Sequence, residues 1–189
     1  MANKMAQRSG VEPGTVTAAM LIIGNEILSG RTKDANLHHL ASELTSLGIR
    51  LIEVRVIPDV EAMIVEAVNE ARQRYDYVFT TGGIGPTHDD ITAECVARAF
   101  GVKLIENPEA RHLLEQQIKK SGNELNEARL RMAKTPDGAS LIDNTYSVVP
   151  GFQMENVYVM AGVPRIMQAM FAGLKKTLRR GLPILSRTI

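Results

Sequence analysis

Apolar runs and helical periods alternate along this chain, and the alternation predicts an α/β fold. Val16–Ile23 is an apolar run rich in β-branched residues that stops at Gly24, which is the pattern of a buried strand. Similar patterns predict further strands at Ile49–Ile57, Tyr75–Thr81, Val102–Ile105, Leu141–Ile142, Val148–Phe152 and Val157–Met160.

Between these strands, apolar residues recur at the spacing of a helix. After Asp34, which can cap a helix, leucines recur at helical spacing up to Gly48. Helices are also expected from Pro58 through Val68 and at Thr92–Phe100, Pro108–Ser121, Asn126–Lys134 and Pro164–Leu178. Strands that alternate with helices indicate a parallel sheet covered by helices on both faces. Residues 16–180 are expected to form one domain, with a loose tail at 1–15 and a C-terminal extension at 181–189.

Composition removes several classes of function. The 22 basic and 21 acidic residues give a formal net charge of +1, so there is no electrostatic case for a nucleic-acid partner. No apolar stretch approaches the ~20 residues needed to cross a bilayer, so no membrane partner is expected. The single cysteine, Cys95, excludes an intramolecular disulfide and fits a reducing, cytoplasmic compartment. Cys95 lies in an apolar helix without an evident base, which favours a buried packing role over a nucleophile.

The clearest candidate for chemistry is the run Thr81-Gly82-Gly83-Ile84-Gly85-Pro86-Thr87, which follows a predicted strand. Open parallel sheets bind ligands beyond the carboxyl ends of their strands. Glycines there let the backbone approach a ligand and present N–H groups to an anion. The run is neither a Walker pattern nor Gly-x-Gly-x-x-Gly, which weakens ATPase and standard dinucleotide hypotheses. A structural turn without a ligand remains the alternative.

Two carboxylates follow this loop directly. Asp89 and Asp90 can hold Mg²⁺, which prefers oxygen ligands that it shares with substrate phosphates. The alternative is structural, because Thr87-His88-Asp89-Asp90 also matches a capping box in which Asp90 satisfies helix N–H groups. One residue can also do both.

Several motifs in the same order resemble one known family. The segment from Thr81 to Thr92 looks like the signature of the MoaB/Mog molybdopterin-binding family, and most closely that of the N-terminal domain of the CinA proteins, a domain also found in FAD synthetases. Further matching segments are Gly24-Asn25-Glu26-Ile27-Leu28-Ser29-Gly30, Asp34-Ala35-Asn36, Pro136-Asp137-Gly138-Ala139, Pro150-Gly151-Phe152 and Ala161-Gly162-Val163-Pro164.

The resemblance implies a three-layer α/β/α sandwich with a mostly parallel central sheet that forms homo-oligomers, as dimers, trimers or hexamers. It implies a phosphorylated pterin or nucleotide as ligand, molybdopterin among the candidates, and Mg²⁺ or another divalent metal as cofactor. The family's two catalytic, metal-binding aspartates fall on Asp59 and Asp90. The residues expected to contact the ligand are Glu26, Asp34, Asn36, Thr81, Gly82, Gly83, Gly85, Pro86, Thr87, Asp89, Thr92, Glu94, Gly162 and Pro164.

Structural alternatives stand beside these assignments. Asp34 and Asp59 both precede helices, so N-capping explains either one, and Glu26 can pair with Arg31. The chain also departs from the family at Ser147-Val148-Val149, where relatives have Gly-Thr-Ala, and in the turn that contains Ala161 and Val163. These departures leave open a change of substrate.

Three functions follow. The first is a molybdopterin-handling protein of molybdenum-cofactor biosynthesis, either a carrier or an adenylyltransferase-like enzyme. The second is a metal-dependent nucleotide pyrophosphatase that acts on molecules of the ADP-ribose or FAD class. The third is a binding or assembly module without catalysis.

Overall fold

The structure is a computed structural model, and it describes residues 12, 14–121, 124–146 and 149–182. Its main sheet has six strands in the order β2-β1-β3-β8-β7-β6. Four neighbours run parallel: β2 (Ile49–Ile57), β1 (Val16–Ile23), β3 (Tyr77–Thr81) and β8 (Val157–Met160). Next to β8, β7 (Gly151–Met154) pairs antiparallel, and the last strand, β6 (Ser140–Ile142), pairs antiparallel with β7. The prediction of a mostly parallel sheet is confirmed.

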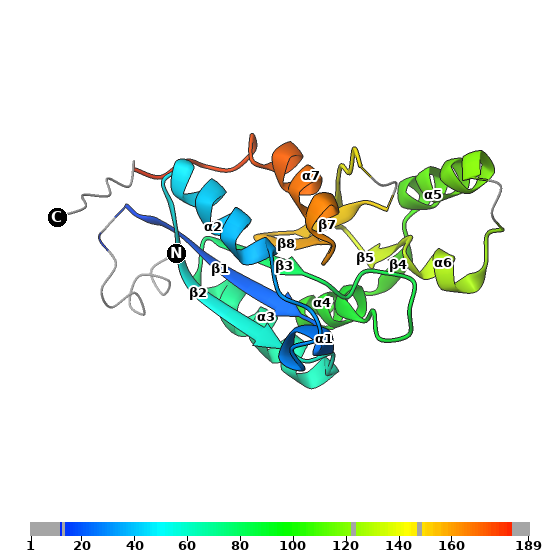
Figure 1. Ribbon diagram of the computed structural model, residues 1–189, viewed down its shortest axis with the longest axis horizontal. Coiled ribbons are helices and arrows are strands. Elements are labelled where there is room, and N and C mark those ends of the chain that lie inside the picture. The colour runs from blue at the N-terminus through cyan, green and yellow to red at the C-terminus, as the bar shows by residue number, and fades with distance from the viewer. Residues whose placement is uncertain (1–11, 13, 122–123, 147–148, 183–189) are drawn as a thin grey trace.

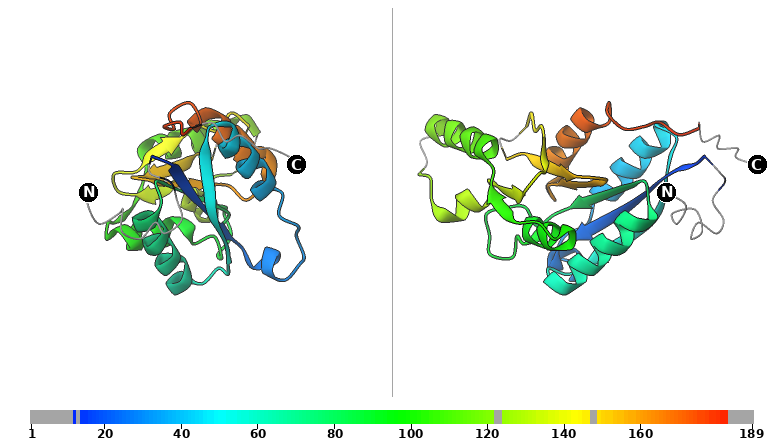
Figure 2. Two further views of the ribbon diagram at one scale, coloured as in Figure 1. Left: turned by 90° about the vertical axis from the view of Figure 1, so that its left-hand side faces the viewer. Right: turned by 180° about the vertical axis from the view of Figure 1, so that it is seen from behind.

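Helices cover both faces of this sheet, as Figures 1 and 2 show. On one face lie α2 (Asn36–Ser46) and α7 (Pro164–Leu174), which pack against Met20 and Phe79. On the other face lie α3 (Glu61–Arg74) and α4 (Thr92–Phe100), which pack against Leu21 and Val78. Strand β1 is buried along its whole length because consecutive side chains enter the two cores in turn. The three-layer α/β/α sandwich is therefore confirmed.

A small lobe projects beyond the sheet, at the right of Figure 1. It contains a two-stranded antiparallel sheet of β4 (Leu104–Glu106) and β5 (Lys134–Pro136), together with α5 (Pro108–Ser121) and α6 (Glu127–Arg131). A separate cluster of buried side chains, including Leu114 and Ile118, forms its core. The short helix α1 (Asn25–Leu28) follows β1 at the opposite side of the glycine loop.

Some predicted boundaries were wrong. The helix expected at Asn126–Lys134 ends at Arg131, and Lys134–Pro136 is instead a strand. The chain tightens at the helix end, where Met132 N–H donates to the Arg129 carbonyl, and pairing with β4 then takes over. The strand expected at Val102–Ile105 is β4, which pairs with β5 rather than with the main sheet. The final helix ends at Leu174 instead of Leu178. Val148 and most of the predicted tail and extension lie outside the described residues.

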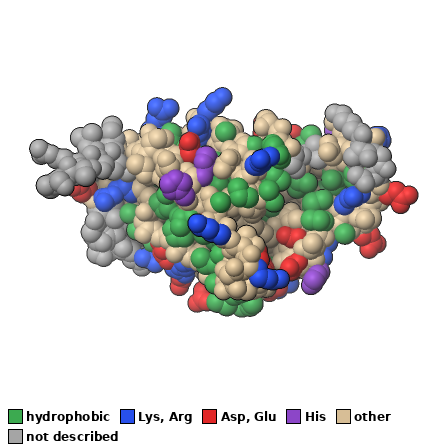
Figure 3. All heavy atoms as spheres, viewed as in Figure 1, with side chains coloured by type: hydrophobic (Ala, Val, Ile, Leu, Met, Phe, Trp, Pro, Cys, Tyr) green, Lys and Arg blue, Asp and Glu red, His purple; other side chains and the backbone are tan. Residues whose placement is uncertain are grey.

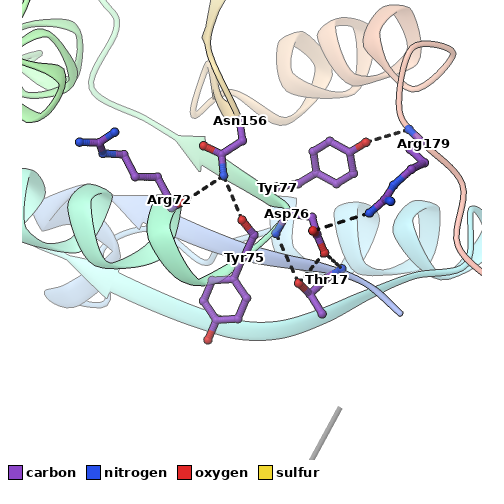
Figure 4. A network of polar contacts seen from close by, with 7 residues as sticks. All are labelled: Thr17, Arg72, Tyr75, Asp76, Tyr77, Asn156 and Arg179. Carbon is purple, nitrogen blue, oxygen red and sulfur yellow. Dashed lines mark hydrogen bonds and ion pairs between the residues drawn. The ribbon is translucent and has the colours of Figure 1, made fainter. Parts of the chain in front are cut away.

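The amino ends of the parallel strands are fastened by a polar network, shown in Figure 4. The Asn156 side-chain amide donates to the carbonyls of Arg72 and Tyr75, at 3.0 and 2.9 Å. Asp76 Oδ2 accepts from the backbone N–H and the hydroxyl of Thr17, at 2.8 and 2.9 Å. These side chains join α3, β1 and the turn before β8, so their role is structural. In the part of the chain that is described, no helix is long and apolar enough to span a bilayer.

Cys95 lies fully buried on α4, as its apolar surroundings predicted. Burial, with smaller contributions from Glu61 and Glu94, raises the pKa of its thiol to about 12. In an unfolded chain a thiol has a pKa of about 8.5. The folded state therefore keeps its proton where the unfolded state loses it, so this stabilisation is complete below about pH 8.5 and is lost as the pH rises toward 12.

We expect the difference in unfolding free energy between the wild type and Cys95→Ala to shrink as the pH rises from about 8 to about 10.5, the range in which only the unfolded thiol ionises. Urea denaturation of both proteins across this range measures it. A difference that stays constant with pH would contradict the buried, protonated thiol.

Candidate functional site

Three parallel strands, β1, β3 and β8, bring their carboxyl ends together at one edge of the sheet. The loop after β3 turns at Gly82 and Gly83, whose φ angles of 99° and 68° favour glycine. Gly82 N–H donates to the Met160 carbonyl at 3.1 Å, and a Cβ on Gly82 would lie 2.1 Å from the Ile23 carbonyl oxygen. The glycine loop is therefore fitted against the ends of both neighbouring strands.

The start of α4 supports this loop from behind. Thr92 N–H donates to the Gly83 carbonyl, and the Thr92 hydroxyl donates to the Gly82 carbonyl, each at 3.0 Å. The buried Thr92 hydroxyl thus holds the loop instead of projecting into solvent. Among the described residues, no hydrogen-bond acceptor meets the backbone N–H groups of Gly83, Ile84 and Gly85. Successive free N–H groups of this kind form an anion-binding concavity.

Asp90 closes a turn in front of the helix. Its Oδ2 accepts from the backbone N–H of Thr87 at 2.8 Å and from the Thr87 hydroxyl at 2.6 Å. Asp90 therefore makes the contact to the Thr87 N–H that a capping box predicts, but α4 begins only at Thr92 and has no side-chain cap, so this contact closes a turn and does not cap the helix. The Thr87 hydroxyl, which has a single proton, also lies within hydrogen-bond distance of the exposed Asp89 carboxylate, and this contact lowers the pKa of the Asp89 carboxyl.

A pocket of about 520 Å³ opens between the glycine loop and the start of α7. It brings together eight of the residues predicted from the sequence: Glu26, Gly82, Gly83, Gly85, Pro86, Asp90, Gly162 and Pro164. Apolar side chains line much of the rest, among them Ile84, Met132, Val163 and Met170. Figure 3 shows hydrophobic side chains exposed beside acidic and basic ones on the face seen in Figure 1. The pocket therefore combines an apolar wall, carboxylates and a loop whose N–H groups have no acceptor among the described residues.

A cavity of about 60 Å³ adjoins this pocket and is lined by the predicted residues Asp34, Asn36 and Thr81. Asp34 Oδ1 accepts from Leu37 N–H at 2.8 Å, so it satisfies a donor in the first turn of α2, as the capping alternative expected. The Asn36 amide donates to the Gly162 carbonyl at 2.7 Å, which ties α2 to the turn before α7. Asn36 Oδ1 and Thr81 Oγ1 are buried without a hydrogen-bond partner among the described residues. Buried polar oxygens normally have a partner, so this cavity suits a donor group or ordered water.

Asp59 occupies a different place. Its Oδ2 accepts from Asn25 N–H at 2.8 Å, which holds the loop after β1 to the end of β2. Helix α3 begins at Glu61 and Val60 is its N-cap residue, so the N-capping alternative for Asp59 was wrong. Asp59 is not among the residues that line the 520 Å³ pocket. The alternative in which Glu26 pairs with Arg31 was also wrong, because Arg31 donates to the Ser29 hydroxyl at 3.1 Å.

On its other side, Asp90 lines a wider cleft of about 680 Å³ between α4 and the small lobe. The predicted residue Glu94 lies here, with a carboxylate oxygen 3.1 Å from Arg98. Arg131 and Lys134 also line this cleft, and sequence reasoning missed both. They looked like ordinary surface cations within one predicted helix, and only the packing of the lobe brings them to the cleft that Asp90 lines.

Among the described residues, no group of three His, Cys, Asp or Glu side chains is placed to hold a metal ion. Asp90 lies against the glycine loop, since a Cβ on Gly85 would lie 2.7 Å from its Oδ2. Mg²⁺ is often held by one or two carboxylates together with substrate phosphates and water. The residues therefore fit a metal shared with a ligand and do not form a cage made by the protein alone.

Comparison with known proteins gives consistent matches. The family model described as a probable molybdopterin binding domain matches residues 19–180. The chain is 40% identical over 173 residues to a protein of Pyrobaculum calidifontis, covering 88% of this chain and 66% of that protein. It is 38% identical over 162 residues to a protein of Archaeoglobus fulgidus, covering 86% and 69%. The chain thus spans about two thirds of the length of these curated relatives.

Solved structures of related proteins have the same fold as this chain. The crystal structure of CinA from Thermoplasma acidophilum, described as having unknown function, is 32% identical with a TM-score of 0.77, covering 87% of this chain and 98% of that one. The tungsten cofactor synthesizing protein MoaB from Pyrococcus furiosus is 19% identical with a TM-score of 0.54, covering 87% and 93%. The second likeness shows the fold alone.

Proposed function

This chain belongs to the MoaB/Mog-like family of molybdopterin-binding domains, and we propose that its pocket binds a phosphorylated pterin or nucleotide together with a divalent metal. One observation carries the proposal: the free N–H groups of Gly83, Ile84 and Gly85 lie beside Asp90 at the edge of one pocket. Backbone N–H groups suit a phosphate, and the apolar wall suits a flat ring.

The residues of this site suit phosphoanhydride chemistry. The glycine-loop N–H groups would neutralise the oxygens of one phosphate, and positioning of that kind supplies most of the catalysis in phosphoryl transfer. Asp90 would hold the metal, with its carboxylate aimed by the two hydrogen bonds from Thr87. The metal, when bound, would polarise phosphate oxygens. Asp59 would position the loop after β1, because its Oδ2 already accepts from the Asn25 N–H.

The small cavity supports a role in ligand recognition. Asn36 Oδ1 and Thr81 Oγ1 would receive a hydroxyl or amino group, such as those of nucleotide sugars and pterins. The Asn36 amide donates to the Gly162 carbonyl, so its free oxygen is fixed in direction.

Two activities fit this arrangement. One is adenylyl transfer to, or carriage of, molybdopterin in cofactor biosynthesis. The other is hydrolysis of a nucleotide pyrophosphate of the ADP-ribose or FAD class. The Thermoplasma CinA structure, described as having unknown function, does not choose between them.

Melting temperatures with and without Mg²⁺ test the proposal, with ADP-ribose, FAD and molybdopterin as separate ligands. A ligand at about a hundred times its Kd stabilises the fold by about 2.7 kcal/mol, which is several degrees for a chain of this size. We expect at least one ligand to raise the melting temperature and Mg²⁺ to increase that rise. Phosphate release, measured after a phosphatase is added to free the product's terminal phosphate, separates turnover from binding. No rise with any ligand would favour an assembly module instead.

A further inference from the structure

The wall of the site opposite the strands comes from the small lobe. A small cavity of about 30 Å³ shares lining residues, Asp90 among them, with both larger spaces. Its lining contains Gly83 and Gly85 of the glycine loop on one side, and Arg131 and Lys134 of the lobe on the other. Arg131 ends α6 and Lys134 begins β5, so the break between these elements places both cations at the same opening.

Carboxylates line the wider cleft next to these cations, but two of them are engaged with other cations. The 680 Å³ cleft is lined by four carboxylates, those of Asp90, Glu94, Glu106 and Glu127. Glu94 lies 3.1 Å from Arg98, and Glu106 lies 2.5 Å from Arg111.

The ion pair between Glu106 and Arg111 leaves Lys134 without its nearest cross-strand carboxylate. Glu106 is the cross-strand neighbour of Lys134, yet its carboxylate is held by Arg111, and this contact raises the pKa of Arg111. Glu127 stands four positions before Arg131 on α6, but no ion pair joins them. Among the described residues, neither Arg131 nor Lys134 forms an ion pair, and both are exposed.

We propose that Arg131 and Lys134 form a second anion subsite, which binds the distal phosphate of a diphosphate whose proximal phosphate lies on the glycine loop. The inference rests on the proposed function for the position of the first phosphate. It goes further by assigning the second phosphate to two cations of the small lobe, which favours a phosphoanhydride-linked diphosphate over a monophosphate. Asp90, which lines all three spaces, stands where the bridge between the two phosphates would lie.

The two cations would contact a phosphate in different ways. The Arg131 guanidinium can bind two phosphate oxygens at once, while the Lys134 ammonium acts as a point charge at the start of β5. If the second subsite holds only the distal phosphate, as we propose, a monophosphate seated on Gly83–Gly85 would leave both cations in water and a diphosphate would reach them. The affinity difference between the two ligands therefore measures the subsite.

The test uses inorganic pyrophosphate and inorganic phosphate as probes, each titrated calorimetrically into the full chain with Mg²⁺ at fixed ionic strength. The variants are Arg131→Gln, Lys134→Gln and the double variant. Arg129→Gln on the same helix is the matched control, because Arg129 donates to the Glu124 carbonyl at 2.5 Å and lines none of the three spaces. Melting temperatures check that each variant is folded.

We expect the wild type to bind pyrophosphate at least about tenfold more tightly than phosphate, given the strength of charge-assisted hydrogen bonds. The double variant should lose about tenfold or more in pyrophosphate affinity, with its phosphate affinity unchanged within about twofold and Arg129→Gln like the wild type. Equal losses for both probes, or no loss of pyrophosphate affinity, would overturn the subsite. So would a wild type that binds no pyrophosphate.

The same titrations separate this inference from the proposed function. If the double variant binds ADP-ribose or FAD as the wild type does, the subsite is wrong while the site stands. If no pterin or nucleotide binds but pyrophosphate affinity still depends on Arg131 and Lys134, the subsite stands and the proposed function falls.

Discussion

Replacing Asp90 with asparagine is expected to lower metal-dependent turnover of the nucleotide or pterin substrate by at least about a hundredfold. Loss of one preorganised electrostatic contact to a transition state typically costs a factor of about 10² to 10³. Asparagine keeps an oxygen that can accept from the Thr87 N–H and hydroxyl, so the turn should survive. The charge that would hold the metal is lost. Steady-state kinetics at several Mg²⁺ concentrations measure the effect.

Glu66→Gln is the matched control for Asp90→Asn, because it also removes one carboxylate charge, but from the exposed face of α3. Its turnover should equal that of the wild type. Melting temperatures of both variants should lie within about 3 °C of the wild type, since surface substitutions rarely change stability by more than about 0.5 kcal/mol. Full activity of Asp90→Asn, or an equal loss in both variants, would rule out Asp90 as the metal-holding group.

Gly82→Ala is expected to destabilise the fold by about 2–5 kcal/mol. A Cβ at this position would lie 2.1 Å from the Ile23 carbonyl oxygen, a backbone atom at the end of β1. The φ of 99° adds the strain that a side chain meets at positive φ, about 1–2 kcal/mol. Relief of the contact requires β1 and β3 to separate, which costs an amount typical of overpacking, about 1–3 kcal/mol. For this chain length the melting temperature should fall by about 10 °C, as calorimetry can measure.

Gly101→Ala separates the two contributions. Gly101 ends α4 with a φ of 66°, and a Cβ there would meet nothing within 4 Å. This variant therefore carries the backbone strain alone and should lose only about 1–2 kcal/mol. A Gly82→Ala variant no less stable than Gly101→Ala would show that the loop is not fitted against β1.

How far the sequence predicted this site can be seen at particular residues. Gly82 and Gly83 were identified because glycines that follow a strand let the backbone approach a ligand, and the structure adds that both have positive φ. Asp90 was placed beside them by adjacency in the chain. The capping-box contact between Asp90 and the Thr87 N–H is present, but it closes a turn because α4 starts two residues later, and no pattern marks so small a shift.

Asp59 and Arg131 show the opposite case. The family resemblance paired Asp59 with Asp90 as metal-binding aspartates. In the structure, Asp59 Oδ2 accepts a hydrogen bond from the Asn25 N–H. Whether it also meets a metal stays a prediction. Arg131 was passed over because a lone surface arginine has no periodic or motif signature. Its neighbours in space include the glycine loop, which lies far from it in the sequence.

The amino-acid pattern by itself determined the layered α/β architecture, the family and the position of the glycine loop, because alternating apolar periods and closely spaced glycines are local signals. The tertiary structure alone decided which carboxylates line the pocket, where Asn36 is held, and which cations of the small lobe meet the loop. Those outcomes depend on the register of β1, β3 and β8 and on how the lobe packs against α4. Contacts between residues distant in the chain are set by such packing, and local sequence carries little information about it.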